Sequence, residues 1–276
     1  MNVAVIKDNI AHELSMNDRV KGIGQTGDIN AELIRGNSDI DLFVLCSAIP
    51  SEEERKQVYQ KYSVEYSECR MNVCSGGMWG YGDILLIDGI DVMFMYFTIE
   101  EMEQYLGEVI QGKHLDRDGG FYPTGRLSSV EGINILYESN GEWTALNEKV
   151  KKHPKELFEK LFNYHIARVL DDEDLGRATL RKEILFYHNV LENSLDHLLQ
   201  ALFALNLTYL PSRKRSEQYI NQFTYKPDDC SNRLHQIVKN SVLSEAIEES
   251  VQELRSITEE TAELGKLIFR NNSPYQ

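Results

Sequence analysis

The chain has 276 residues, 42% of them hydrophobic and 26% charged, which is the composition of an ordinary globular protein with one large or two moderate domains. Its formal net charge of −15 disfavours a long nucleic acid as a partner, because an acidic surface repels phosphate. No segment reaches the roughly 20 apolar residues that cross a bilayer, and the N-terminus has no signal-peptide pattern. We therefore expect no membrane partner. Since the four cysteines lack a Cys-x-x-Cys pair, we expect reduced thiols in a cytoplasmic protein.

The first half of the chain mixes strand and helix patterns. Helix starts are indicated by two capping boxes, Ser51 with Glu54 and Thr98 with Glu101. Asp88-Gly89 between two apolar runs predicts a tight β-hairpin. We expect strands at 20–24, 39–46, 62–69, 83–87 and 90–97, and helices at 8–18, from 51 and at 98–110.

Three connecting segments stand out by composition. Residues 22–28 hold three glycines, which permit positive φ and close approach of the backbone to a ligand. Residues 111–129 are polar and contain glycine, and we expect a long loop there. Residues 139–142 are interpreted as a hinge between two halves of the chain.

The second half is dominated by helix patterns. Leucines and isoleucines spaced along residues 180–205 predict one long helix, and further helices are expected from 154, from 211, at 231–240 and at 241–269. We therefore expect an α+β protein in which a small mixed-sheet domain, residues 1–140, precedes an all-α helical bundle domain, residues 141–276.

Three aspartates are the candidate chemical centre. Asp39 and Asp41 begin the apolar strand 39–46, and their spacing points both carboxylates to one side of an extended chain. They could simply face water, but Asp91 adds a third carboxylate inside another apolar strand, where a partner or a metal is needed. Carboxylate oxygens favour Mg²⁺ or Mn²⁺ over zinc. Two such ions beside a glycine loop would suit a triphosphate.

The segment from Gly27-Asp28 through 38–42, with Asp91 downstream, resembles the nucleotidyltransferase superfamily related to DNA polymerase β over residues 15–100. The helical half is similar, more loosely, to the bundle of kanamycin-type and lincosamide-type antibiotic nucleotidyltransferases. The resemblance implies that Asp39 and Asp41 bind both metals and that Asp91 binds the catalytic metal and helps to deprotonate the acceptor.

The nucleotide-binding residues are less directly defined. If Gly27 aligns with the family glycine, Asp28 replaces the family serine and puts a negative charge near the triphosphate. Alternatively Gly24 takes that role, with Gln25 or Thr26 as the polar contact and a longer loop to Ser38, and we prefer this alignment. The candidate nucleotide-binding set is Gly24, Gln25, Thr26, Gly27, Ser38 and Lys214.

The expected function is Mg²⁺-dependent transfer of a nucleoside monophosphate from a nucleoside triphosphate, ATP in the first instance, to a hydroxyl of a small molecule such as an aminoglycoside or lincosamide. Alternatives are a protein-modifying enzyme of the toxin–antitoxin type and a non-catalytic regulatory domain. Glu192 or Asp196 would be the acceptor-side base, although solvated helix carboxylates are the simpler interpretation. The pair Arg181 and His188 matches the spacing of ribonuclease-type helical domains, a weak signal, and a homodimer is left open.

Overall fold

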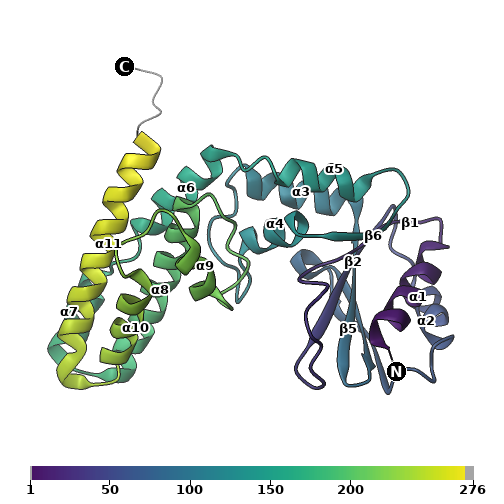
Figure 1. Ribbon diagram of the computed structural model, residues 1–276, viewed down its shortest axis with the longest axis horizontal. Helices are drawn as coiled ribbons and strands as arrows, with labels where there is room; N and C mark the ends of the chain where they lie inside the picture. Colours follow the sequence, from purple (N-terminus) through teal and green to yellow (C-terminus); the bar gives the residue numbers. More distant parts are fainter. Residues whose placement is uncertain (1, 271–276) are drawn as a thin grey trace. The chain divides into compact units, whose positions relative to one another are not determined.

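The computed structural model describes residues 2–270 and confirms the α+β class: a six-stranded mixed sheet precedes a helical C-terminal region (Figure 1). The chain divides into two compact units. Unit 1 comprises residues 1–109 and 126–152, and unit 2 comprises residues 110–125 and 153–276. They differ from the predicted division at 110–125 and 141–152. The assignment of residues 1–140 as a catalytic domain and 141–276 as a bundle domain stays a prediction.

The sheet belongs to unit 1. Its strands are β1 (Val20–Gln25), β2 (Asp39–Cys46), β3 (Glu68–Ser75), β4 (Tyr81–Ile87), β5 (Ile90–Thr98) and β6 (Asn134–Glu138). The strand order is β3-β4-β5-β2-β1-β6, and β2 with β5 is the parallel pair in this otherwise antiparallel sheet. The accompanying helices are α1 (Val3–Ser15), α2 (Glu52–Gln60), α3 (Ile99–Ile110), α4 (Pro123–Glu131) and α5 (Glu142–Val150), with a 3₁₀ turn at Gly77–Trp79.

The two faces of strand β2 have different neighbours. Its even-numbered residues, Ile40, Leu42 and Val44, join the buried core together with apolar residues of α1. Figure 1 shows α1 and α2 on one side of the sheet. The odd-numbered face carries Phe43, whose ring lies 5.6 Å from that of Phe97 and 6.3 Å from that of Trp143. The continuous apolar run of β2 is typical of a strand that is buried on both faces.

Local turn and cap signals form as the residues predict. Asp88 and Gly89, at φ 49° and 74°, close the β4–β5 hairpin with two left-handed residues, the backbone that an Asp-Gly turn requires. Ser51 and Glu54 form a reciprocal capping box. At the start of α3 the carboxylate of Glu101 accepts bonds from Thr98 N and Oγ1, at 3.0 and 2.7 Å.

Four predicted elements differ in the structure. The expected loop over 111–129 contains the start of α4, since Pro123 suits a first helical turn and Leu127 and Val130 are buried. Strand β3 begins at Glu68, later than expected. The hinge at 139–142 instead leads into α5. The long helix over 180–205 is interrupted at Lys182, which adopts φ 55° and ends the first of two helices.

Unit 2 consists mainly of helices. They are α6 (Lys155–Ile166), α7 (Asp172–Arg181), α8 (Ile184–Leu205), α9 (Ser216–Gln222), α10 (Cys230–Asn240) and α11 (Ile247–Arg270), with a 3₁₀ turn at Ser244–Ala246. α8 is the central helix, because most of its residues from Leu198 onward are buried. Over residues 2–270, no helix is both long and apolar enough to cross a bilayer.

Candidate functional site

The parallel β2–β5 pair brings two of the predicted catalytic aspartates to adjacent positions. Asp39 is the direct register partner of Asp91, and Asp41 is opposite Met93. Because side chains alternate along a strand, all three carboxylates lie on the odd-numbered face of the sheet. Asp39 is exposed, whereas Asp41 and Asp91 are half-buried. The structure therefore gathers the three predicted metal ligands on one face, at the start of the parallel pair.

Asp91 is neither deeply buried nor without a partner. Its side chain is 46% exposed, and its Oδ1 lies 3.3 Å from Nη2 of Arg70 on β3. Asp91 lies inside the apolar strand β5 and has a partner, as expected, but its carboxylate is not buried. Strand β5 begins at Ile90, so Asp91 is its second residue and lies near the solvent-exposed start of the strand.

The fully buried aspartate of unit 1 is Asp83, which sequence reasoning missed. It is 0% exposed and accepts hydrogen bonds from Arg55 Nε at 2.7 Å, Tyr59 OH at 3.0 Å and the backbone N–H of Asn72 at 3.0 Å. A buried carboxylate that accepts from an arginine and two further donor residues needs no metal. In the sequence, Asp83 and Asp91 look alike, since each is one acidic residue in an apolar strand. The partner that distinguishes Asp83, Arg55, is remote in sequence.

The glycine loop begins inside strand β1. A Cβ on Gly24 would lie 2.3 Å from Cδ1 of Ile133, so glycine permits close packing there. Gln25 pairs with Leu42 and therefore faces α1, where its Oε1 accepts a bond from Lys7 Nζ at 2.7 Å. Its side chain lies on the opposite face from the aspartates. A nucleotide contact by Gln25 would have to come from its backbone.

The residues after β1 approach the aspartates through the backbone. Thr26 N donates to the carbonyl oxygen of Asp41 at 3.0 Å. Gly27 has φ 78° and no atom within 4 Å of the Cβ position. The carboxylate of Asp28 accepts from Asn30 N at 2.9 Å, and Ser38 Oγ accepts from Ile34 N at 2.8 Å. The loop thus places Thr26 and Gly27 next to the strand that carries Asp41.

Arg126 of α4 is a further charged residue on this face that sequence reasoning did not identify. Its guanidinium carbon lies 4.4 Å from the centre of the Phe43 ring and 4.9 Å from that of Phe97, and it donates to the carbonyl of Met78. Burial lowers the pKa of Arg126 to about 10, although the negative charge of Asp41 acts to raise it. It stays protonated at neutral pH. Because α4 was expected to be loop, its register on the sheet could not be anticipated.

The donor chemistry of the three aspartates fits Mg²⁺ or Mn²⁺, because every side-chain donor is a carboxylate oxygen at a solvent-accessible edge. Their ligand atoms do not all lie within 4.8 Å of one another. In the part of the chain that the structure describes, that criterion is met by Asp116, His165 and His197 of unit 2. These two groups differ in their donor atoms and lie in different units.

Two of the three candidate residues of the bundle, Glu192 and Asp196, have structural partners. Lys214 is exposed, and Glu192 pairs with Arg213. Asp196 is buried and accepts from Tyr122 OH and from Gln200 Nε2 at 3.0 Å, so the expectation of a solvated carboxylate is wrong for it.

The two residues with the ribonuclease-type spacing lie on different helices. Arg181 ends α7, whereas His188 belongs to α8, and its Nε2 lies 3.0 Å from Ser241 Oγ. Because the helix is interrupted at Lys182, Arg181 and His188 do not lie on one helix.

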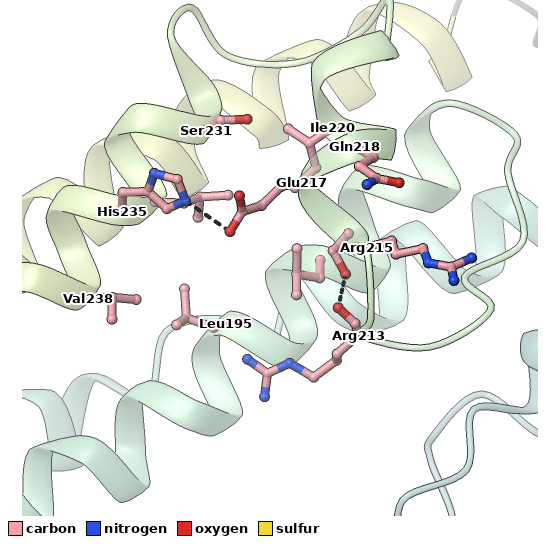
Figure 2. Close-up of a pocket in the computed structure, with 12 residues that line it drawn as sticks. Leu195, Arg213, Arg215, Glu217, Gln218, Ile220, Ser231, His235 and Val238 are labelled. Carbon is pink, nitrogen blue, oxygen red and sulfur yellow. Dashed lines mark hydrogen bonds and ion pairs between the residues drawn. The ribbon is translucent and has the colours of Figure 1, made fainter. Parts of the chain in front are cut away.

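A cavity of about 410 Å³ in unit 2 has an apolar floor and a charged rim. Its apolar lining includes Leu195 and Ile220. Figure 2 shows His235 and Glu217 pointing toward one another at its edge, with Nε2 and Oε1 2.9 Å apart. None of the predicted site residues lines this cavity. It has the size and mixed lining of a small-molecule site.

Residues 121–215, about a third of the chain, match the family described as Domain of unknown function (DUF4037). No curated protein matches the chain.

Two of the solved structures that match this chain have low sequence identity to it. One is a nucleotidyltransferase-like protein from Exiguobacterium sibiricum 255-15, with 12% identity and a TM-score of 0.48, covering 96% of this chain and 78% of that one. The other is the soluble domain of CorA from Methanocaldococcus jannaschii, with 13% identity and a TM-score of 0.16, covering 89% and 96%.

Proposed function

We propose that this protein transfers a nucleoside monophosphate from a nucleoside triphosphate to a hydroxyl of a small molecule and releases pyrophosphate. The observation that carries the proposal is the parallel β2–β5 register, which sets Asp39 opposite Asp91 with Asp41 on the same face. Carboxylates on the same face of neighbouring strands repel one another unless cations join them. One such partner is present, because the guanidinium of Arg70 lies 3.3 Å from the carboxylate of Asp91.

Asp39, Asp41 and Asp91 would hold Mg²⁺ or Mn²⁺, which when bound neutralises triphosphate charge and favours loss of pyrophosphate. The backbone N–H of Thr26 is already donated to the carbonyl oxygen of Asp41, so within this loop the N–H of the next residue, Gly27, would contact phosphate oxygens. Gly27 suits that contact because no atom crowds it.

The acceptor class follows from charge. A net charge of −15 favours a cationic acceptor over a nucleic acid, which supports an aminoglycoside-like small molecule bearing hydroxyl groups. ATP is the first nucleotide to test, and the cytoplasm, which supplies it, is the compartment in which we expect the reaction. A contact of Lys214 with the nucleotide is part of this proposal. Whether the chain forms a homodimer is a question for direct measurement.

The test is pyrophosphate release by the purified full-length chain with each nucleoside triphosphate, Mg²⁺ and a panel of hydroxyl-bearing acceptors. We expect release with one acceptor class and loss of it in Asp41→Asn. The matched control is Asp88→Asn, which removes a carboxylate at the hairpin turn of the same unit. No release with any combination, or equal release by Asp41→Asn, would overturn the proposal. Labelling of protein bands by labelled ATP in lysate would move the acceptor to proteins.

A further inference from the structure

Two histidines of unit 2 face one another through the same ring nitrogen. His165 near the end of α6 and His197 of α8 place their Nδ1 atoms 2.9 Å apart. His165 Nε2 lies 3.0 Å from the carbonyl oxygen of Leu115, which can only accept, so Nε2 carries the proton. His165 is fully buried, which favours its neutral form. Its Nδ1 therefore presents an unprotonated lone pair toward His197.

A carboxylate completes the group. Asp116 follows Leu115 directly, and its Oδ2 accepts a hydrogen bond from Tyr164 OH at 2.6 Å. Tyr164 directly precedes His165. The hydrogen bonds of Tyr164 to Asp116 and of His165 to Leu115 therefore join these two pairs of consecutive residues. One ligand atom from each of Asp116, His165 and His197 lies within 4.8 Å of the others. Metal-bound histidines and carboxylates are commonly oriented by such outer hydrogen bonds.

We propose that Asp116, His165 and His197 form a Zn²⁺ site, with Nδ1 of both imidazoles and one carboxylate oxygen as ligands. Tetrahedral Zn²⁺ with bonds of about 2.0–2.1 Å separates two nitrogen ligands by roughly 3.3 Å. The observed 2.9 Å requires the rings to part by a few tenths of an ångström. His197 would move its proton from Nδ1 to Nε2, so no net proton is lost when the N–H···N bond is replaced.

The donor set distinguishes this site from the aspartates of unit 1. Two imidazoles and one carboxylate favour Zn²⁺, whereas Mg²⁺ prefers oxygen ligands. Three protein ligands leave a fourth position for water. Asp116 and His197 both line a polar cavity of about 690 Å³, which gives an ion a route to the site. Five aspartates and two arginines line that cavity, so its charge favours a cation.

The test uses the metal-depleted full-length protein and the metal alone. Titration calorimetry with Zn²⁺ is expected to show one strong site per chain, and Co²⁺ is expected to give the visible absorption of four-coordinate cobalt. His197→Gln and Asp116→Asn should each weaken Zn²⁺ binding by about 100-fold or more. Loss of an outer-shell partner costs up to about 100-fold, and loss of a ligand should cost at least as much. Tyr164→Phe, which removes the bond to Asp116, should weaken it by about 10-fold.

The matched control is His235→Gln, an exposed histidine of the same unit with a single ion pair to Glu217. It should bind Zn²⁺ as the wild type does. Asp116→Asn keeps the acceptor for Tyr164 and lies at the surface, so it reports on the site even if His197→Gln does not fold. Absence of a Zn²⁺ site, or a site that survives both ligand substitutions, would overturn the proposal. Because Asp41→Asn should leave Zn²⁺ binding unchanged, this inference does not depend on the proposed transferase function.

Discussion

Asp83 and Asp91 lie on neighbouring antiparallel strands, and each pairs with an arginine, yet their surroundings differ. Asp83 is fully buried with Arg55, Tyr59 and the backbone of Asn72 as donors. Asp91 is half-exposed and has one ion pair, at 3.3 Å. An acidic residue in an apolar strand therefore marks a ligand site only where its own partners leave carboxylate oxygen atoms available.

The largest expected effect is on stability at the buried carboxylate. Asp83→Ala leaves the Arg55 guanidinium buried without its counter-charge and should lower the free energy of unfolding by about 3–5 kcal/mol. The paired control is Asp91→Ala, whose exposed ion pair is worth about 1 kcal/mol or less. Urea unfolding of the two variants measures the difference, and equal losses would break the distinction between them.

Removing both members of the buried pair should restore part of that loss. Arg55→Met combined with Asp83→Leu eliminates the isolated charge and fills the space with apolar groups, so it should be more stable than Asp83→Leu alone by more than about 1 kcal/mol. The same urea experiment supplies the double-mutant cycle. Additive losses would mean that Arg55 and Asp83 are not energetically coupled.

A smaller effect is expected at the exposed pair. Arg70 competes with a cation for Asp91, so Arg70→Ala should strengthen Mn²⁺ binding without nucleotide by up to about 5-fold, the equivalent of an exposed ion pair. Mn²⁺ titration followed by electron paramagnetic resonance measures it. Weaker binding in Arg70→Ala would show that Asp91 is not available to a metal when its arginine is removed.

The smallest effect concerns the surface carboxylate Glu54. The guanidinium of Arg19, together with Ser51, lowers the pKa of Glu54 from 4.5 to about 2. A carboxylate with a lowered pKa stabilises the fold above pH 4.5, and that contribution is lost as the pH falls from 4.5 to 2. The melting-temperature difference between wild type and Glu54→Gln should therefore shrink over that range. A difference independent of pH would contradict the assigned cause.

Local signals in the sequence predicted much of unit 1. The run after Asp41 fixed a doubly buried strand, and Asp88-Gly89 fixed the hairpin, because both depend on nearest neighbours. The parallel partnership of β2 and β5 was not derivable from spacing, since it joins residues 52 apart. The same limit hid the Arg55–Asp83 pair and the placement of Arg126 on Phe43.

The histidine pair shows the limit most clearly. His165 and His197 are two of seven scattered histidines, and nothing in their spacing separates them from the others. Their approach depends on the packing of α6 against α8, and the third member, Asp116, comes from a segment that was expected to be loop. Non-local packing therefore decides this group, whereas the Asp-x-Asp pattern of β2 is readable directly.

The central claim is that Asp39, Asp41 and Asp91 hold a divalent ion together with a nucleoside triphosphate. Electron paramagnetic resonance of Mn²⁺ with ATP tests it on wild type, Asp41→Asn and the control Asp88→Asn. We predict ATP-dependent Mn²⁺ binding that Asp88→Asn retains and that Asp41→Asn weakens by about 100-fold, the loss of a metal ligand costing at least as much as that of an outer-shell partner. Equal binding by Asp41→Asn and wild type would contradict the account.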